Sequence, residues 1–119
     1  MFIGDISEND IQEPVFCIGP LNLNRQTKKA STTLGTLLLL DENEFDVLYM
    51  LATREGESLT LERLYAAVWG AEGGIQEQEA ARRILDSLAR KVNEAGADFM
   101  WIEYASNSGY TFKIHWRRW

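Results

Sequence analysis

The stretch that decides the fold is residues 41–70, which read DENEFDVLYMLATREGESLTLERLYAAVWG. Asp41 stands three residues before Glu44, the spacing of a capping box, in which the first side chain caps an early backbone N–H and the glutamate bonds back. Apolar residues then recur at helical spacing, and Gly56 supplies a stop signal. Thr60 is a candidate cap for a second apolar-striped helix of about three turns. The stretch therefore predicts two consecutive helices.

A third amphipathic helix is predicted from near Gln76 or Glu79 to about Asn93, with Gly96 as its C-terminal signal. Its apolar stripe is formed by Ala81, Ile84, Leu85, Leu88 and Val92. The opposite side is polar and carries Glu79, Arg83, Asp86, Ser87 and Arg90, with Arg82 and Lys91 at its flanks. This helix would bury one side and present the other to solvent or to a partner.

Short β-strands are predicted before the helices. Residues 15–24 (VFCIGPLNLN) alternate in part and are rich in strand formers, with Gly19 and Pro20 marking a kink or an edge. Residues 25–33 are polar and fit a turn or a short edge strand, and the apolar run 37–40 (LLLL) fits a strand. Short strands with turn signals between them predict an antiparallel sheet.

A β-hairpin is predicted at the end of the chain, where FMWIEY (99–104) and YTFKIHW (110–116) flank the turn-forming sequence ASNSG. Alternation in the second segment predicts one face formed by Tyr110, Phe112, Ile114 and Trp116. It predicts an opposite, outward face formed by Thr111, Lys113 and His115.

The order of strands, three helices and a hairpin predicts an α+β fold. It is typical of a winged helix-turn-helix with an N-terminal antiparallel sheet, three helices and a C-terminal β-hairpin wing. In this arrangement two helices brace a third, whose exposed side fits a DNA major groove about 12 Å wide.

The composition fits one globular domain, since 45% of the 119 residues are apolar and 25% are charged. No apolar run approaches the ~20 residues of a membrane span, which predicts no membrane partner. The first 14 residues carry four acids and no basic residue, which excludes a secretory signal. We assign residues 15–116 to the domain, 1–14 to a linker or loose arm and 117–119 to a tail. A chain with a single cysteine fits a reducing, cytoplasmic location.

Residues for catalysis or metal binding are scarce. Cys17 and His115 are the single cysteine and the single histidine, so neither has the further ligands that a metal site needs. The sequence also lacks a phosphate-binding glycine loop with lysine and a nucleophile elbow. It therefore predicts no enzyme activity, no metal and no cofactor. Cys17 fits a small buried side chain in a strand, and Trp69, Trp101 and Trp116 fit the core.

The net charge of −6 is unevenly distributed along the chain. Residues 41–79 contain ten acids and two arginines, whereas residues 80–119 contain seven basic residues and four acids. Such asymmetry lets the basic part face a polyanion while the acidic part points away from it.

Several segments together resemble the OmpR/PhoB family of response-regulator effector domains. The matching segments are IGPLNLN (18–24), residues 37–70, ARRILDSLARKV (81–92) and SNSGYTF (106–112). The most specific features are the L-x-x-x-E-F start of the first helix, the L-x-x-x-V-W-G end of the second and the final G-Y pair. The resemblance covers about residues 15–114.

The resemblance implies a four-stranded amino-terminal sheet, a third helix that acts as recognition helix and a wing at Asn107–Tyr110. It implies sequence-specific binding of double-stranded DNA in bacterial transcription regulation, as the output domain of a two-component phosphorelay response regulator. It also implies a homodimer on tandem DNA sites. The candidate DNA contacts are Arg82, Arg83, Ser87, Arg90 and Lys91 on the helix, and Ser106, Thr111 and Lys113 in the wing. The loop Ala71, Glu72, Gly73, Gly74, Ile75 and Gln76 lies where this family contacts RNA polymerase.

The chain also departs from the family pattern. The family's recognition helix is usually basic where this chain has Asp86, Ser87 and Ala89. In the wing, Ser106 and Thr111 stand where the family commonly has arginines. Each lost phosphate contact lowers the salt dependence of binding by about one unit, so we expect weaker DNA affinity than is typical of the family.

The same residues admit simpler interpretations. The helix charges also fit solvent-exposed ion pairs of Glu79 with Arg82 or Arg83, and of Asp86 with Arg90. The wing residues fit the polar side of a half-exposed sheet, and the loop fits an ordinary connection. For the whole chain, the alternative is a winged-helix protein-interaction module with weakened or lost DNA binding, whose acidic middle binds a basic partner.

Overall fold

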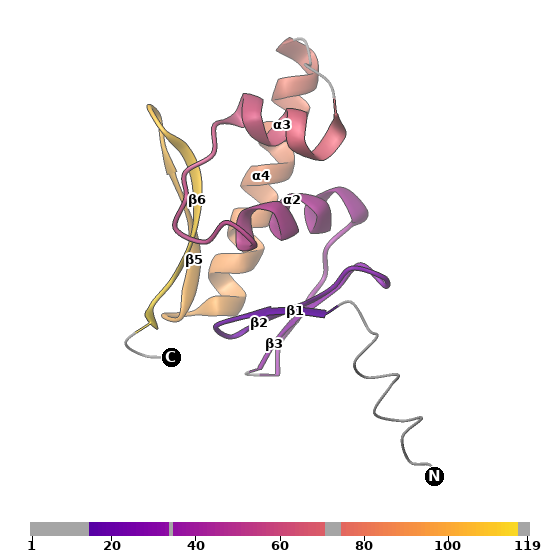
Figure 1. Cartoon of the computed structure of the whole chain (residues 1–119), viewed down its shortest axis with the longest axis vertical. Coiled ribbons are helices and arrows are strands. Elements are labelled where there is room, and N and C mark those ends of the chain that lie inside the picture. Colours follow the sequence, from indigo (N-terminus) through magenta and orange to yellow (C-terminus); the bar gives the residue numbers. More distant parts are fainter. Residues whose placement is uncertain (1–14, 34, 71–74, 117–119) are drawn as a thin grey trace.

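The computed structural model describes residues 15–33, 35–70 and 75–116. These residues form three helices, a four-stranded sheet and a two-stranded hairpin. Figure 1 shows the sheet below the helices and the hairpin along one side of them. The element order and the two sheets confirm the predicted α+β winged-helix architecture. The predicted linker 1–14 and tail 117–119 lie outside the described residues.

The N-terminal sheet is antiparallel, in the order β1 (Val15–Ile18), β2 (Leu21–Asn24), β3 (Lys29–Thr32) and β4 (Leu37–Leu38). Residues 19 and 20 form a turn between β1 and β2 rather than a kink within one strand. The sheet packs against the helices through its buried inner residues Leu21, Leu23, Ala30 and Leu38.

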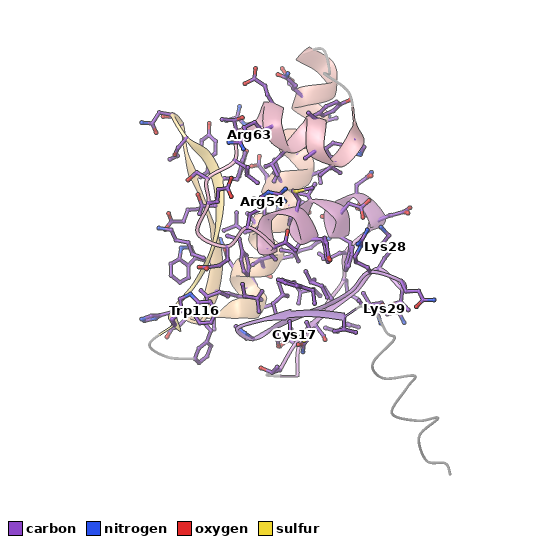
Figure 2. All side chains as sticks on the ribbon, viewed as in Figure 1. Cys17, Lys28, Lys29, Arg54, Arg63 and Trp116 are labelled. Carbon is purple, nitrogen blue, oxygen red and sulfur yellow. The ribbon has the colours of Figure 1, made fainter. Side chains whose placement is uncertain are left out.

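Two predictions for this sheet are wrong. The strand predicted at 37–40 has only two residues, and Leu39 is 75% exposed because it lies beyond the last strand pairing. Cys17 is exposed rather than buried, because it alternates with Phe16 and Ile18 and therefore lies on the outer face of β1 (Figure 2).

Three helices follow the sheet: α2 (Glu42–Ala52), α3 (Leu61–Trp69) and α4 (Ile75–Gly96). The predicted capping box starts α2, since the Asp41 carboxylate accepts from the Glu44 backbone N–H at 2.7 Å and Glu44 Oε1 accepts from the Asp41 N–H at 3.0 Å. The predicted cap of α3 is also confirmed, because Thr60 Oγ1 accepts from the Arg63 N–H at 3.2 Å.

The helix ends differ from the prediction in two places. Helix α2 ends at Ala52, with Thr53 as its C-cap, before the predicted stop at Gly56. Helix α4 begins at Ile75, next to the earlier of its two predicted starts at Gln76 and Glu79, so Ile75 and Gln76 of the predicted polymerase-contacting loop belong to its first turn. The glutamines and glutamates of this segment are good helix formers, which explains the longer helix.

The hairpin pairs β5 (Met100–Ala105) with β6 (Gly109–Ile114), and its predicted inner residues Tyr110, Phe112 and Ile114 are buried. The prediction that Thr111 faces outward is wrong. It is buried because its hydroxyl hydrogen-bonds the Ser58 hydroxyl at 2.7 Å, where the α2–α3 connection covers the strand. Trp116 is 52% exposed instead of belonging to the core, because β6 ends at Ile114 (Figure 2).

One core joins the sheet, the helices and the hairpin. Its largest fully buried side chains come from all of these elements and include Leu23, Phe45, Leu48, Leu88, Met100 and Phe112. Trp69 packs against this core while remaining partly exposed, and Trp101 is also only partly buried.

Glu44 of α2 fixes α4 against the core. Its side chain is buried and accepts hydrogen bonds from Ser87 Oγ at 2.7 Å and from Lys91 Nζ at 2.8 Å, besides the backbone N–H of Asp41. Lys91 Nζ also donates to the carbonyl of Leu39 at 2.9 Å. Because Ser87 and Lys91 belong to α4, this carboxylate sets the rotation of α4 about its own axis.

The same contacts change the acidity of Glu44. Burial raises its pKa by disfavouring the charged form, but the hydrogen bonds from Lys91, Ser87 and the Asp41 backbone outweigh burial and hold the pKa below the ordinary value of 4.5. A group that is more acidic in the native state than in the unfolded state stabilises the native state above its ordinary pKa. That contribution is lost as the pH falls through the native pKa.

We expect Glu44→Gln to lower the free energy of unfolding by about 1–3 kcal/mol at neutral pH, because a neutral amide replaces a charged acceptor of two side-chain donors. Lys91 keeps access to solvent, so the loss stays below that of a fully buried pair. Urea unfolding across a pH series measures the effect. The gap between parent and variant should shrink below about pH 4.5 as Glu44 becomes protonated. The exposed Glu42→Gln is the control, and a gap that does not change with pH would contradict the assignment.

The hairpin is docked on the start of α3 by a close backbone contact. Leu59 and Tyr110 exchange two backbone hydrogen bonds, each 2.8 Å long. Gly109 precedes this bridge with a φ of +101°, and a Cβ atom there would lie 2.1 Å from the Leu59 carbonyl oxygen. Only glycine satisfies both the positive φ and the close approach.

We expect Gly109→Ala to destabilise the fold by more than about 3 kcal/mol, since backbone strain of roughly 1–3 kcal/mol adds to a steric clash. Gly35→Ala is a matched control, because Gly35 has a similar φ of +97° but a Cβ atom added there would meet no other atom within 4 Å. It should lose only the strain contribution. Equal losses for the two variants in urea unfolding would show that the close approach is unimportant.

Candidate nucleic-acid interface

Helix α4 has one buried side and one exposed side, as its sequence pattern predicts. Ala81, Leu85, Leu88 and Val92 are buried against the remaining elements, which include α2, α3 and β5. On the opposite side Arg83, Asp86 and Arg90 are all exposed. The helix therefore presents a charged ridge to solvent along its middle turns.

Arg83 and Arg90 are the freest cations of this ridge. Neither forms an ion pair or hydrogen bond with any residue that the structure describes, so the predicted pairing of Asp86 with Arg90 is not formed. The two arginines are two helical turns apart, which corresponds to about 10 Å along the axis. Both guanidinium groups keep all their donors for an external partner.

Arg82 lies at the edge of the ridge and contacts the hairpin. Its guanidinium lies over the ring of Tyr104, 5.6 Å from the centroid, and its charge acts on the nearby Tyr110 phenol. The two tyrosine rings pack with their centroids 4.8 Å apart. Burial raises the pKa of the Tyr110 phenol, the negative charge of Asp86 raises it further, and Arg82 partly opposes this. Arg82 thus joins α4 to β5 and β6.

Ser87 and Lys91 are candidate DNA contacts by sequence, but the structure gives both an internal partner. Each donates to the buried carboxylate of Glu44, on the side of α4 that faces α2. Both side chains therefore position α4 against α2.

In the hairpin, the candidate residues have different environments. Ser106 is exposed in the turn between β5 and β6. Lys113 is half-exposed and lies 3.3 Å from Glu103 on the neighbouring strand. The hydrogen bonds that Glu103 accepts from Trp101 and Lys113 lower its pKa below the ordinary value. Thr111 is buried, and its hydroxyl is hydrogen-bonded to Ser58.

The predicted polymerase-contacting loop is only partly described. Ala71–Gly74 lie outside the described residues, and Ile75 and Gln76 begin α4. Beside this end of the helix, Asn43, Tyr65, Trp69, Ala80, Ala81 and Ile84 line an open hollow of about 220 Å³.

Other kinds of site find no support in the described part of the chain. Within it, no three histidine, cysteine or acidic side chains are grouped so that they could hold a metal ion. None of its helices is long and apolar enough to span a bilayer.

Sequence reasoning misses the roles of Glu44 and Tyr104. It identifies Glu44 only as half of a capping box, although the same carboxylate also binds Ser87 and Lys91. A signal for Tyr104 is present, because the hairpin register places it directly opposite Tyr110. An aromatic pair at the end of a hairpin forms a platform for a nearby cation.

Comparison with known proteins identifies the family. The sequence model described as "Transcriptional regulatory protein, C terminal" matches residues 35–112, which is more than half of the chain. No curated protein sequence gives a significant match.

Several solved structures of similar shape are DNA-binding domains. That of CpxR from E. coli is 27% identical with a TM-score of 0.69, and the match covers 85% of this chain and 97% of that one. The domain of E. coli CadC is 21% identical with a TM-score of 0.70, covering 87% and 94%. The domain of Klebsiella pneumoniae RstA, solved in complex with RstA box, is 20% identical with a TM-score of 0.69, covering 86% and 99%. The chain belongs to the OmpR/PhoB-type family of C-terminal domains of transcriptional regulatory proteins.

Proposed function

We propose that this domain binds double-stranded DNA in a sequence-specific manner, with α4 in the major groove and the β5–β6 hairpin as a wing. The observation that carries the proposal is the exposed ridge of α4, on which Arg83 and Arg90 have no partner among the described residues. The family consists of transcription regulators and is not an enzyme family, and RstA of this fold has been solved with RstA box.

The dimensions of α4 fit this role. A helix with its side chains is about 10–12 Å across, and the major groove is about 12 Å wide. The roughly 10 Å between Arg83 and Arg90 corresponds to about three base pairs at about 3.4 Å each. Each arginine can therefore reach a guanine edge or a flanking phosphate at opposite ends of a short recognition segment.

The hairpin supplies the second contact in this proposal. Its turn contains the exposed Ser106, and Lys113 lies half-exposed on β6, so both can meet the sugar–phosphate backbone beside the groove. Arg82, which lies over the Tyr104 ring, stands where α4 and the hairpin meet. Phosphate contacts at this junction would set the register of α4 on the duplex.

We further propose the regulatory setting that the family suggests. The domain acts as the output domain of a response regulator in a two-component phosphorelay, binds tandem sites as a homodimer and contacts RNA polymerase near residues 71–76. The hollow lined by Tyr65 and Trp69 supports the polymerase contact, because it offers an apolar surface between α3 and the N-terminal half of α4.

The decisive variant reverses both free arginines, Arg83→Glu and Arg90→Glu. We expect at least a 100-fold loss of duplex affinity, because each contact contributes about 1–3 kcal/mol and each reversal adds repulsion. If the arginines grip phosphates, the slope of log affinity against log salt should fall by about two units. Fluorescence anisotropy with a selected duplex at several salt concentrations measures both quantities.

The matched control is Arg25→Glu with Lys29→Glu, which changes the net charge equally on exposed residues beside the β2–β3 turn. Figure 2 shows Lys29 on the side of the molecule away from the hairpin. This control should lose much less affinity than the α4 variant. If both double variants lost similar duplex affinity, the effect would come from the change in net charge and not from contacts of Arg83 and Arg90. Weak, salt-independent binding by the parent would instead favour the protein-interaction module.

A further inference from the structure

Asp86 is an unpaired carboxylate in the middle of the α4 ridge. It is exposed, three residues after Arg83 and four before Arg90, and it forms no ion pair or hydrogen bond with the described residues. Three arginines stand at ion-pair spacing from Asp86, but Arg82 lies over the Tyr104 ring, and neither Arg83 nor Arg90 pairs with Asp86. Toward the described residues, the Asp86 oxygens are therefore free to accept hydrogen bonds.

A free carboxylate at this position is costly for a helix that enters DNA. Asp86 would lose water on docking and would face a polyanion, so it destabilises the complex unless a donor on the DNA replaces the lost hydrogen bonds. The phosphates offer only acceptors. Any compensating donor must come from a base edge.

The chemistry of the major groove narrows the choice of base. Guanine presents two acceptors there and thymine presents an acceptor and a methyl group, so neither donates to a carboxylate. Adenine presents the N6 amino donor beside the N7 acceptor, which repels the second carboxylate oxygen. Cytosine presents the N4 amino donor without an adjacent acceptor of its own. Cytosine is therefore the base whose edge best matches Asp86.

We infer that Asp86 is a specificity-determining residue that selects a cytosine between the two base pairs or phosphates reached by Arg83 and Arg90. This inference rests on the proposed DNA-binding function. It also gives a reason for an acid in a helix that binds DNA: Asp86 lowers affinity for every sequence except those that place a cytosine amino group opposite it.

The test compares the full chain with Asp86→Asn, which keeps the size of the side chain and replaces one acceptor by a donor. Each protein is used to select bound duplexes from a random pool at two ionic strengths. The parent should select a motif with an invariant cytosine, preferred on the order of 10-fold over other bases. Asp86→Asn should change that one position to adenine, since an amide pairs with adenine N6 and N7. The remaining positions should be unchanged.

Glu94→Gln is the matched control, because it removes the same charge from an exposed position two turns further along α4. It should leave the selected motif unchanged, with any gain in affinity equal for all sequences. If Asp86→Asn gives the parent motif with uniformly tighter binding, Asp86 merely opposes phosphate and the inference is wrong. If the parent selects no duplex at all, it is the proposed function that fails.

Discussion

The orientation of α4 depends on one buried carboxylate. Glu44 caps the N-terminus of α2 through the capping box and holds α4 through Ser87 and Lys91. Removing a carboxylate from water is unfavourable, and only the combination of backbone, hydroxyl and ammonium donors makes the charged form stable there. Glu44 therefore connects α2 to α4 in addition to capping α2. Through this connection, formation of α2 is coupled to the orientation of the exposed ridge of α4.

A second set of contacts holds α4 on its other side, where it meets the hairpin. Ser87 and Lys91 are directed to α2, whereas Arg82 is directed to the tyrosines of the hairpin. Helix α4 is thus held on both flanks, and Arg83, Asp86 and Arg90 of its central ridge have no hydrogen bond or ion pair with the described residues. The docking of the hairpin on Leu59 through Gly109 fixes the second flank to the start of α3. Residues distant in sequence therefore cooperate to pre-organise one charged surface, which reduces the ordering cost of any partner that binds there.

Local signals in the sequence are sufficient to predict the helices and strands. The side-chain environments that were predicted wrongly depend on contacts with distant residues. The Asp41 and Thr60 caps and the apolar stripe of α4 depend on neighbours along the chain, so they are readable without a structure. The environment of Thr111 depends on Ser58, more than fifty residues away, and alternation alone places it in solvent. The helical spacing also puts Ser87 near the ridge, but its direction is decided by Glu44 on another helix. The sequence therefore predicts that this side of α4 is exposed. It does not predict which of its side chains bind α2 or the hairpin and which remain free.

Under the proposed function, the acidic net charge affects how this domain distinguishes its specific DNA sites from non-specific DNA. Non-specific affinity comes from phosphate contacts, and this chain has few cations on α4 that are free to make them. Under the proposed function, the base contacts of Arg83, Arg90 and Asp86 would not depend on that general attraction. When phosphate contacts contribute little, each base contact is a larger fraction of the total binding free energy. A mismatched base pair then brings the affinity closer to that for non-specific DNA. Under the proposed function, the acidic residues therefore weaken binding to the many non-specific sites of a genome. The domain then occupies mainly the few DNA sites whose bases match Arg83, Asp86 and Arg90.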